Sequence, residues 1–168
     1  MKKLCIIPAA LLLLNCGSIK TLPEAAESGY TVASCPENNA CTLDIIKNKS
    51  LIIKEDGTGS LYYSTSDNPE INIIKYRYTK ESNPQFQDSG YIEEVIFEIP
   101  ANSKRLDYND STLQETKMLF SVMCFCRGKA GNYAVKEGSL TYDGDMLHIV
   151  LPDLVEGQKL HDIKVAFK

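Results

Sequence analysis

The chain has 168 residues, of which 18 are basic and 22 are acidic, so its formal net charge at neutral pH is −4. This acidic balance argues against nucleic acid as a partner, because contacts to phosphate need clustered lysine and arginine. The length fits one domain, which can bury a core without a metal ion. Since no catalytic, metal-binding or cofactor motif stands out, we expect neither a cofactor nor an enzyme.

The N-terminal segment has the pattern of an export signal. Lys2 and Lys3 precede eleven uncharged residues, from Leu4 to Leu14, and the sequence then becomes polar at Asn15. Positive charge followed by a short apolar run is typical of a secretory signal peptide. Eleven residues in a helix rise only about 16 Å, whereas the hydrocarbon core of a bilayer is about 30 Å thick. The run is therefore too short to span a membrane.

The end of this signal, Leu13-Leu14-Asn15-Cys16, resembles the lipobox of bacterial lipoproteins, in which a leucine lies three residues before a cysteine. The resemblance implies that the thiol of Cys16 is lipidated, that the chain is cut just before it and that the new N-terminus is acylated. Asn15 departs from the pattern, in which Ala or Gly is commoner. The resemblance covers only the N-terminal segment and implies nothing about the rest of the chain.

The same resemblance implies a location and a division of the chain. Loss of Lys2 and Lys3 from the 18 basic residues leaves 16 against 22 acidic ones, a net charge of −6. We therefore expect attachment to the membrane through acyl chains and not through attraction to anionic lipid. No acidic run follows Cys16, so we expect an outer-membrane anchor in the bacterial cell envelope, with the domain in the periplasm. The expected segments are a signal peptide at 1–15, a lipidated N-terminus and tether at 16–28, and a β-rich domain at 29–168.

Beyond the tether, short β-rich runs alternate with turn signals. Runs at 30–34 and 42–47 flank a loop, and runs at 51–54 and 60–63 enclose Asp56-Gly57-Thr58-Gly59, which predicts a hairpin. Apolar residues alternate at 71–73 and again at 76–78, but in the opposite phase. This change of phase predicts a β-bulge between the two runs.

The second half of the chain continues the β pattern. Residues 91–99 alternate, 117–126 are apolar on both faces as in a buried strand, and 163–167 alternate again. Runs at 140–142 and 146–151 enclose Asp143-Gly144, the clearest hairpin signal, while 101–116 is the only long irregular stretch. Together the runs predict a single all-β domain, an antiparallel β-sandwich or barrel-like sheet of about eight to ten strands.

Four cysteines remain for the mature domain, and an even number in an exported chain predicts two disulfides. Cys124 and Cys126 share one face of a strand with Cα atoms about 6.5 Å apart, at the upper edge of disulfide geometry. We therefore expect two bridges that clamp Cys35 and Cys41 to this strand. The alternative joins Cys35 to Cys41 and Cys124 to Cys126. A redox or copper-binding role for Cys124 and Cys126 is a weaker alternative.

Two tyrosine pairs, Tyr62 with Tyr63 and Tyr76 with Tyr78, are candidates for a binding face, because tyrosine combines apolar area with a polar tip. Packing within the sheet is the other interpretation.

The carboxylates of the 91–99 run do not indicate acid/base catalysis. Glu94 and Glu98 share a strand face but lie about 13 Å apart, beyond the spacing of a glycosidase pair. Glu93 and Glu94 face opposite ways.

The sequence thus predicts a membrane-anchored envelope lipoprotein whose disulfide-bonded domain is a binding or assembly-support module. Its partner would be an envelope protein or a small ligand that the sequence does not identify. A small-molecule carrier of lipocalin-like form is the alternative, and it requires a closed barrel with a wide apolar cavity. The mature domain is similar only in a general way to small β-rich envelope lipoproteins.

Overall fold

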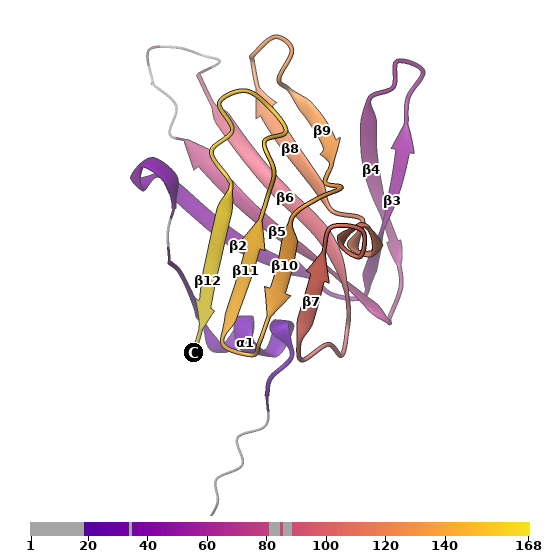
Figure 1. Ribbon diagram of the computed structural model, residues 1–168, viewed down its shortest axis with the longest axis vertical. Helices are drawn as coiled ribbons and strands as arrows, with labels where there is room; N and C mark the ends of the chain where they lie inside the picture. Colours follow the sequence, from indigo (N-terminus) through magenta and orange to yellow (C-terminus); the bar gives the residue numbers. More distant parts are fainter. Residues whose placement is uncertain (1–18, 34, 81–84, 86–88) are drawn as a thin grey trace, which may run out of the picture.

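The computed structural model describes residues 19–33, 35–80, 85 and 89–168. Twelve strands in three antiparallel sheets make up most of this part of the chain (Figure 1), which confirms the predicted all-β domain. The number of strands exceeds the predicted eight to ten or so, because strands of only three or four residues carry little periodicity. The signal peptide and Cys16 lie outside the described residues.

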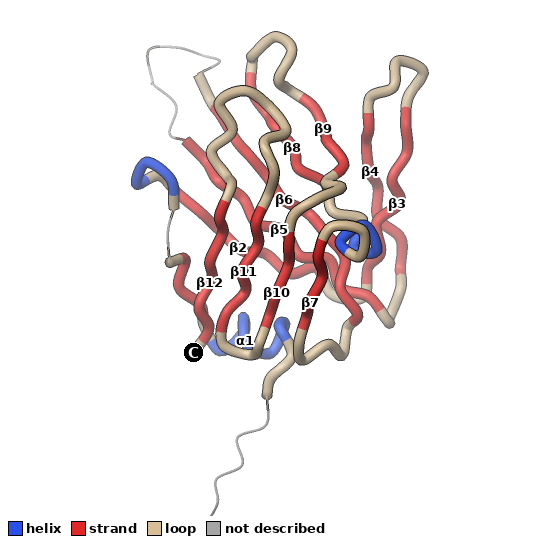
Figure 2. The backbone as a smooth tube through the Cα atoms, viewed as in Figure 1, coloured by secondary structure: helices blue, strands red, loops and turns tan. Residues whose placement is uncertain are grey.

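In the described part of the chain, helical structure is confined to short segments at the periphery (Figure 2). These are the helix α1 (Leu22–Ser28) and the 3₁₀ turns η1 (Pro36–Asn38) and η2 (Leu113–Thr116). The strands are β1 (Tyr30–Val32), β2 (Ala40–Ile46), β3 (Lys49–Glu55), β4 (Leu61–Asp67), β5 (Ile71–Lys80), β6 (Tyr91–Pro100), β7 (Leu106–Asn109), β8 (Leu119–Cys124), β9 (Gly131–Ala134), β10 (Ser139–Tyr142), β11 (Met146–Val150) and β12 (Asp162–Phe167).

Two five-stranded sheets face each other as a sandwich. One has the order β1-β12-β11-β10-β7 and the other the order β2-β5-β6-β8-β9. The main hydrophobic core lies between them, with large buried side chains such as Phe97, Phe120 and Tyr142. Both sheets keep two open edges within the described residues, so they form a sandwich and no closed barrel. The barrel that the carrier alternative requires is therefore absent from this part of the chain.

The hairpin of β3 and β4 forms a third sheet on the outer face of the β2-β5-β6-β8-β9 sheet. Its Leu51 packs against Ile73, Ile96 and Leu119 in a second buried cluster. At its turn, the Asp56 carboxylate accepts hydrogen bonds from the backbone N–H groups of residues 58 and 60. The hairpin predicted from this stretch is confirmed, and it leaves β5, β6 and β8 with buried side chains on both faces.

This double burial explains why the predicted β-bulge is wrong. β5 pairs with β6 in an unbroken register from Ile71 opposite Pro100 to Lys80 opposite Tyr91. Ile73 belongs to the outer cluster under the hairpin, whereas Tyr76 belongs to the main core. The apolar pattern changes phase because the buried face changes, and the strand itself remains regular.

The segment 22–28, predicted as part of the tether, is the helix α1. Thr21 caps it, because the Thr21 hydroxyl accepts from the Glu24 N–H and the Glu24 carboxylate accepts from the Thr21 N–H. Leu22 and Ala25 are buried in the main core. The tether prediction is therefore wrong for these residues, and the folded domain begins at about Thr21, before the predicted boundary at 29.

The remaining hairpin prediction is confirmed, and the irregular stretch is partly corrected. β10 and β11 pair from Ser139 opposite Val150 to Tyr142 opposite Leu147, around Asp143-Gly144. The stretch predicted as irregular at 101–116 contains β7, which pairs with β10 at the edge of its sheet. Short edge strands of this kind give only one or two periodic positions to detect.

Candidate functional site

The four cysteines pair within their own segments. Cys35 is bonded to Cys41, with Cα atoms 5.7 Å apart, and Cys124 to Cys126, with Cα atoms 5.2 Å apart. Both distances lie in the usual range for disulfides. The favoured prediction of two bridges between the loop and the strand is therefore wrong, and the alternative pairing is the one present. The Cα atoms of Cys124 and Cys126 are close enough for a disulfide because the chain turns out of β8 after Cys124.

This pairing makes a direct prediction for the purified protein. Proteolysis under non-reducing conditions, with cleavage between the two cysteine pairs, is expected to release a peptide containing Cys35 and Cys41 separately from one containing Cys124 and Cys126. Mass spectrometry detects each bridge as a loss of two hydrogens within its own peptide. A disulfide-linked product that joins the two regions would contradict the connectivity.

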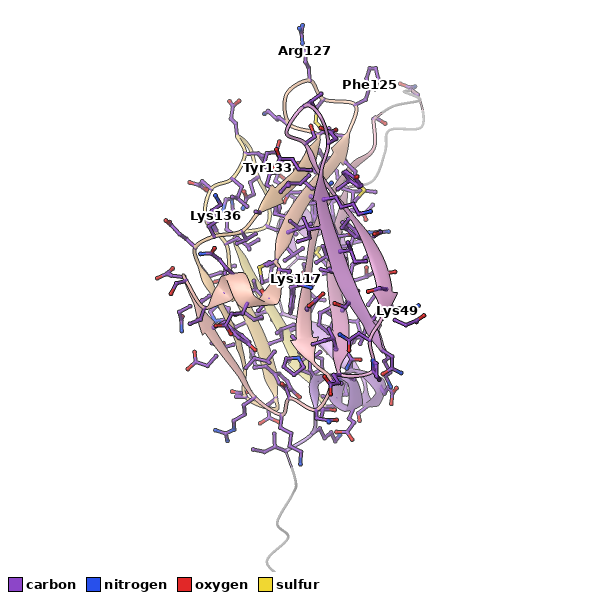
Figure 3. The ribbon with its side chains drawn as sticks, turned by 90° about the vertical axis from the view of Figure 1, so that its right-hand side faces the viewer. Lys49, Lys117, Phe125, Arg127, Tyr133 and Lys136 are labelled. Carbon is purple, nitrogen blue, oxygen red and sulfur yellow. A yellow bond between two sulfur atoms is a disulfide. The ribbon has the colours of Figure 1, made fainter. Side chains whose placement is uncertain are left out.

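The tip loop, which we define as residues 125–130 between β8 and β9, presents an aromatic side chain to solvent. Phe125 is 88% exposed, the highest value among the exposed large hydrophobic residues, and Arg127 points outward beside it (Figure 3). The sequence run at 117–126 predicted a buried strand here, which is wrong beyond Cys124. Gly128, with φ of +79°, and its charged neighbours are turn signals that could have ended the predicted strand earlier.

The four tyrosines proposed for a binding face do not come together. Tyr76 and Tyr78 are fully buried in the main core, whereas Tyr62 is 47% exposed on β4. Tyr63 packs beside the second cluster and hydrogen-bonds to Glu94. The prediction of one tyrosine face is therefore wrong, because β4 lies in a different layer from β5.

The two buried tyrosine hydroxyls have opposite hydrogen-bond status, which predicts opposite effects of removing them. The Tyr76 hydroxyl has no partner among the described residues, whereas the Tyr78 hydroxyl accepts from Asn39 and donates to Glu37. We expect Tyr76→Phe to raise the free energy of unfolding by about 1 kcal/mol and Tyr78→Phe to lower it by about 1 kcal/mol. Urea unfolding of the two variants measures both, and a loss of stability in Tyr76→Phe would contradict the assignment.

Tyrosine burial also predicts a loss of stability in alkali. Burial, together with the charge of Glu94 and a hydrogen bond to it, raises the pKa of Tyr63 to about 12, and burial with a smaller effect of Tyr30 raises the pKa of Tyr76 to about 12. Unfolded tyrosine titrates near pH 10. The neutral phenols therefore contribute stability that is complete below about pH 10 and is lost as the pH rises to about 12. Urea unfolding across this range is expected to show a steeper decline for the native chain than for Tyr76→Phe, and equal slopes would argue against it.

Glu94 lies between the hairpin and the sheet and is nearly fully buried. Its carboxylate accepts from Arg77 Nε and Nη2 at 3.1 and 2.8 Å and from the Tyr63 hydroxyl at 3.2 Å, and Lys75 Nζ is 3.7 Å away. Ser121 is opposite Glu94 on β8. This polar row fixes β4 to the outer face of the sheet.

A hollow of about 650 Å³ lies where the start of β4 meets β9, and we call it the edge groove. Its walls include residues 59–61 on the hairpin side and 130–134 on the other. Within the described residues, β4 pairs only with β3 and β9 only with β8. A hydrogen bond of 2.8 Å from Asn132 Nδ2 to the Leu61 carbonyl crosses it. Local sequence patterns do not predict this groove, because Leu61 and Asn132 on its two walls lie 71 residues apart along the chain.

A second hollow adjoins the edge groove beneath the tip loop. Its volume is about 490 Å³, and it shares residues 130–132 with the edge groove. Glu94 and Tyr63 line its polar part, while Met123, 40% exposed, lines its apolar part. The tip loop, this hollow and the edge groove therefore form one continuous candidate binding surface.

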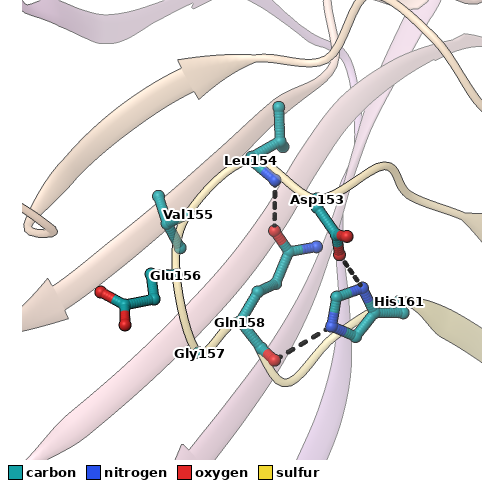
Figure 4. Close-up of a pocket in the computed structure, with 7 residues that line it drawn as sticks. All are labelled: Asp153, Leu154, Val155, Glu156, Gly157, Gln158 and His161. Atoms are coloured by element: carbon teal, nitrogen blue, oxygen red, sulfur yellow. Dashed lines mark hydrogen bonds and ion pairs between the residues drawn. The ribbon is translucent and has the colours of Figure 1, made fainter.

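A further concavity, in the loop before β12, is an element of the fold (Figure 4). The buried Gln158 amide accepts from Leu154 N–H and donates to the carbonyls of Pro152 and Leu160. His161 donates from Nε2 to the Gln158 carbonyl, and its Nδ1 lies 3.3 Å from an Asp153 carboxylate oxygen. Because these polar groups satisfy one another, the loop has the arrangement of a closed turn and not of a ligand site.

No family model, curated protein or solved structure matches this chain. Its described helices are too short and too polar to cross a bilayer. In the same part of the chain, no three histidine, cysteine or acidic side chains converge in a way that could hold a metal ion. The surface at the tip loop and the edge groove is therefore the feature on which a function can be argued.

Proposed function

We propose that this chain is a lipid-anchored protein of the bacterial cell envelope whose β domain binds a partner protein. The anchor would be Cys16, in the outer membrane, with the domain in the periplasm. Support for the anchor comes from the lipobox-like Leu13-Leu14-Asn15-Cys16 and the apolar run before it. Support for the binding role comes from the tip loop, at the end of the sandwich opposite α1.

The exposure of Phe125 is the observation that carries the binding role. An aromatic ring that is 88% exposed contributes nothing to the core, but aromatic and arginine side chains are enriched at the centres of protein interfaces. The Cys124 to Cys126 bridge restricts the loop that holds the ring, which lowers the entropy lost on binding.

The position of this loop fits an anchored protein. The helix α1 lies at one end of the sandwich, and the tip loop between β8 and β9 lies at the other (Figure 1). A tether that enters beside α1 would leave the tip loop facing away from the membrane. The tip loop would then face the periplasm, where it could contact a partner protein.

Site-specific photo-crosslinking in cells tests this role. A photoreactive phenylalanine analogue replaces Phe125 in one chain and Val150, 37% exposed on β11 of the other sheet, in a matched control. We expect a discrete protein adduct from the first position and none from the second. Adducts of equal yield from both positions, or adducts only with lipid, would overturn the proposed binding role.

A further inference from the structure

We propose that the end of the sandwich around Ile19 and α1 rests directly on the phospholipid headgroups of the membrane, and that the short connection to Cys16 holds it there. This inference rests on the proposed lipid anchor at Cys16 and assigns a partner to the end of the domain opposite the tip loop. We call this end the membrane face and define it by Ile19, Lys20, the loop at 101–105 and the turn at 143–145.

The folded chain begins very close to the proposed anchor. The Lys20 carbonyl accepts from the Tyr142 hydroxyl at 3.2 Å, and Lys20 Nζ donates to the Ser28 hydroxyl at 2.9 Å. Leu22, two residues further on, is fully buried in the main core. From Lys20 onward the chain is therefore bonded to the sandwich and does not act as a tether.

The length of chain between Cys16 and this bonded segment limits how far the domain can lie from the membrane. Only Gly17 and Ser18 separate Cys16 from Ile19, and these three steps span at most about 11 Å even when fully extended. The polar layer on each side of a bilayer is about 5 to 7 Å thick. Since acyl chains on Cys16 hold it at the boundary of the hydrocarbon core, Ile19 must lie within the headgroup layer or no more than about 6 Å beyond it.

Ile19 is the apolar part of the membrane face. Its side chain is 37% exposed, and its Cγ2 lies so close to Gly144 that a Cβ there would approach it to 2.8 Å. The turn thus supports Ile19 from the side of the domain, while the rest of the side chain faces solvent. An apolar side chain held at this height can enter the headgroup layer, where the burial of its exposed area is favourable.

The charged side chains of the membrane face are of both signs. Lys20, Lys104 and Arg105 are positive, and Asp143 and Asp145 are negative; all five are exposed. This mixture matches zwitterionic headgroups, whose phosphates can accept from lysine and arginine and whose ammonium groups can pair with carboxylates. Because the charges nearly cancel, the contact should need no anionic lipid.

A hollow of about 560 Å³ on the membrane face gives a headgroup a place to dock. Ile19, Lys20, Asn102 and Lys104 line it. Glu24 lines it as well, but its carboxylate already accepts from the Thr21 N–H and the Thr21 hydroxyl, each at 2.8 Å. Lys104 forms no ion pair within the described residues, so its ammonium group is available to a phosphate oxygen.

The short connection makes weak headgroup contacts sufficient. A short linker gives the second of two linked contacts an effective concentration in the millimolar range. Contacts of millimolar affinity, which would not hold a free protein, are then occupied in an anchored one. The domain is expected to stand on its membrane face, with the tip loop at the end that points away from the bilayer (Figure 1).

Tryptophan fluorescence can test this contact, because the chain contains no tryptophan of its own. The full-length chain is purified with its lipid, which mass spectrometry locates on Cys16, and is placed in vesicles of phosphatidylethanolamine and phosphatidylcholine that include nitroxide-labelled headgroups. Ile19→Trp and Lys104→Trp report on the membrane face, and the second avoids the packing against the 143–145 turn. Tyr62→Trp, 47% exposed beside the β3-β4 turn at the opposite end, is the matched control.

We expect the labelled headgroups to quench about half of the fluorescence or more at Ile19→Trp and Lys104→Trp and less than about a tenth at Tyr62→Trp, because only the membrane face reaches the headgroup layer. Quenching should persist at about 1 M salt, where charges are screened beyond about 3 Å.

A longer connection provides a second test that leaves the domain itself unchanged. Ten glycine and serine residues inserted between Ser18 and Ile19 lengthen the connection from three steps to thirteen, which lowers the effective concentration about ninefold. We therefore expect quenching at Lys104→Trp to fall about twofold or more after the insertion.

Three outcomes in the lipidated chain would overturn the inference. They are equal or absent quenching at the membrane face and at Tyr62→Trp, unchanged quenching after the insertion, and quenching that requires phosphatidylglycerol and is lost at high salt, which would assign the contact to anionic lipid. An unmodified Cys16 would overturn the lipid anchor and this inference together. Crosslinking from Phe125 tests the binding role separately.

Discussion

Replacing Glu93 with alanine is expected to lower the free energy of unfolding by about 4 kcal/mol. The carboxylate is fully buried and accepts the backbone N–H groups of Lys159 at 2.8 Å and Leu160 at 2.7 Å, together with the Tyr91 hydroxyl at 2.5 Å. The bonds from Lys159 and Leu160 join β6 to the loop before β12, and β12 belongs to the opposite sheet. Alanine would leave buried donors without an acceptor, and each such loss costs about 1 to 3 kcal/mol.

Chemical denaturation, with the midpoint and the slope both fitted, measures this effect. Glu93→Gln keeps one acceptor oxygen and nearly the same volume, so we expect it to lose less stability than Glu93→Ala. Glu55→Ala removes an exposed carboxylate at the hairpin turn and should change stability little. If Glu93→Ala and Glu55→Ala were equally mild, the assigned role of Glu93 between the sheets would be wrong.

The second large effect is expected at Glu98, which holds the β3-β4 hairpin against the sheet. Its carboxylate accepts from the Ser50 hydroxyl at 2.7 Å, from the Leu51 N–H and from Lys117 Nζ at 3.0 Å. We expect Glu98→Ala to lower the free energy of unfolding by about 3 kcal/mol, because it leaves a backbone donor and a lysine without their buried acceptor.

The hairpin gives this variant a specific readout. Hydrogen exchange of the β3 and β4 amides is expected to become faster in Glu98→Ala relative to the amides of β11 and β12, which belong to the other sheet. Asp67→Ala removes the exposed partner of Lys49 on the same hairpin and should give no measurable change. A uniform increase in exchange across both sheets would show that Glu98 does not act on the hairpin in particular.

Turn chemistry was the part of the fold that local sequence determined best. Asp56 and Asp143 each accept backbone N–H groups within their own turns, so the signal and the structure involve the same few residues. The start of α1 was equally local, since Thr21, Pro23 and Glu24 form a capping box with a proline in the first turn. The predicted tether at 16–28 did not take this capping box into account.

The layers of the fold could not be predicted from periodicity. A strand with one buried face alternates, but β5 changes its apolar phase because Ile73 packs under the hairpin while Tyr76 packs in the main core. The sequence placed Glu94 and Glu98 on one face of β6, in agreement with their positions, but it gave no indication that the face was covered. That cover comes from β3 and β4, about thirty to fifty residues earlier in the chain.

The candidate site depends on the same long-range contacts. The spacing of the four cysteines along the chain permits either disulfide pairing, so the sequence alone does not decide between them. The turn after Cys124 brings Cys124 and Cys126 together and decides for the pairing within each segment. The edge groove can be predicted only when it is known which strand edges remain unpaired. A run of alternating residues does not contain that information. Phe125 looked like the end of a buried strand until the position of the turn was known.

Metabolic labelling with a fatty-acid analogue tests the central claim, that this β domain is held at a membrane by a lipid on Cys16. The intact chain and Cys16→Ala are expressed in a diderm bacterial host, and incorporation of the label is compared after gel separation. We predict label in the intact chain, none in Cys16→Ala, and a shift of the variant from the membrane to the soluble fraction. Equal incorporation in the two chains would contradict the account.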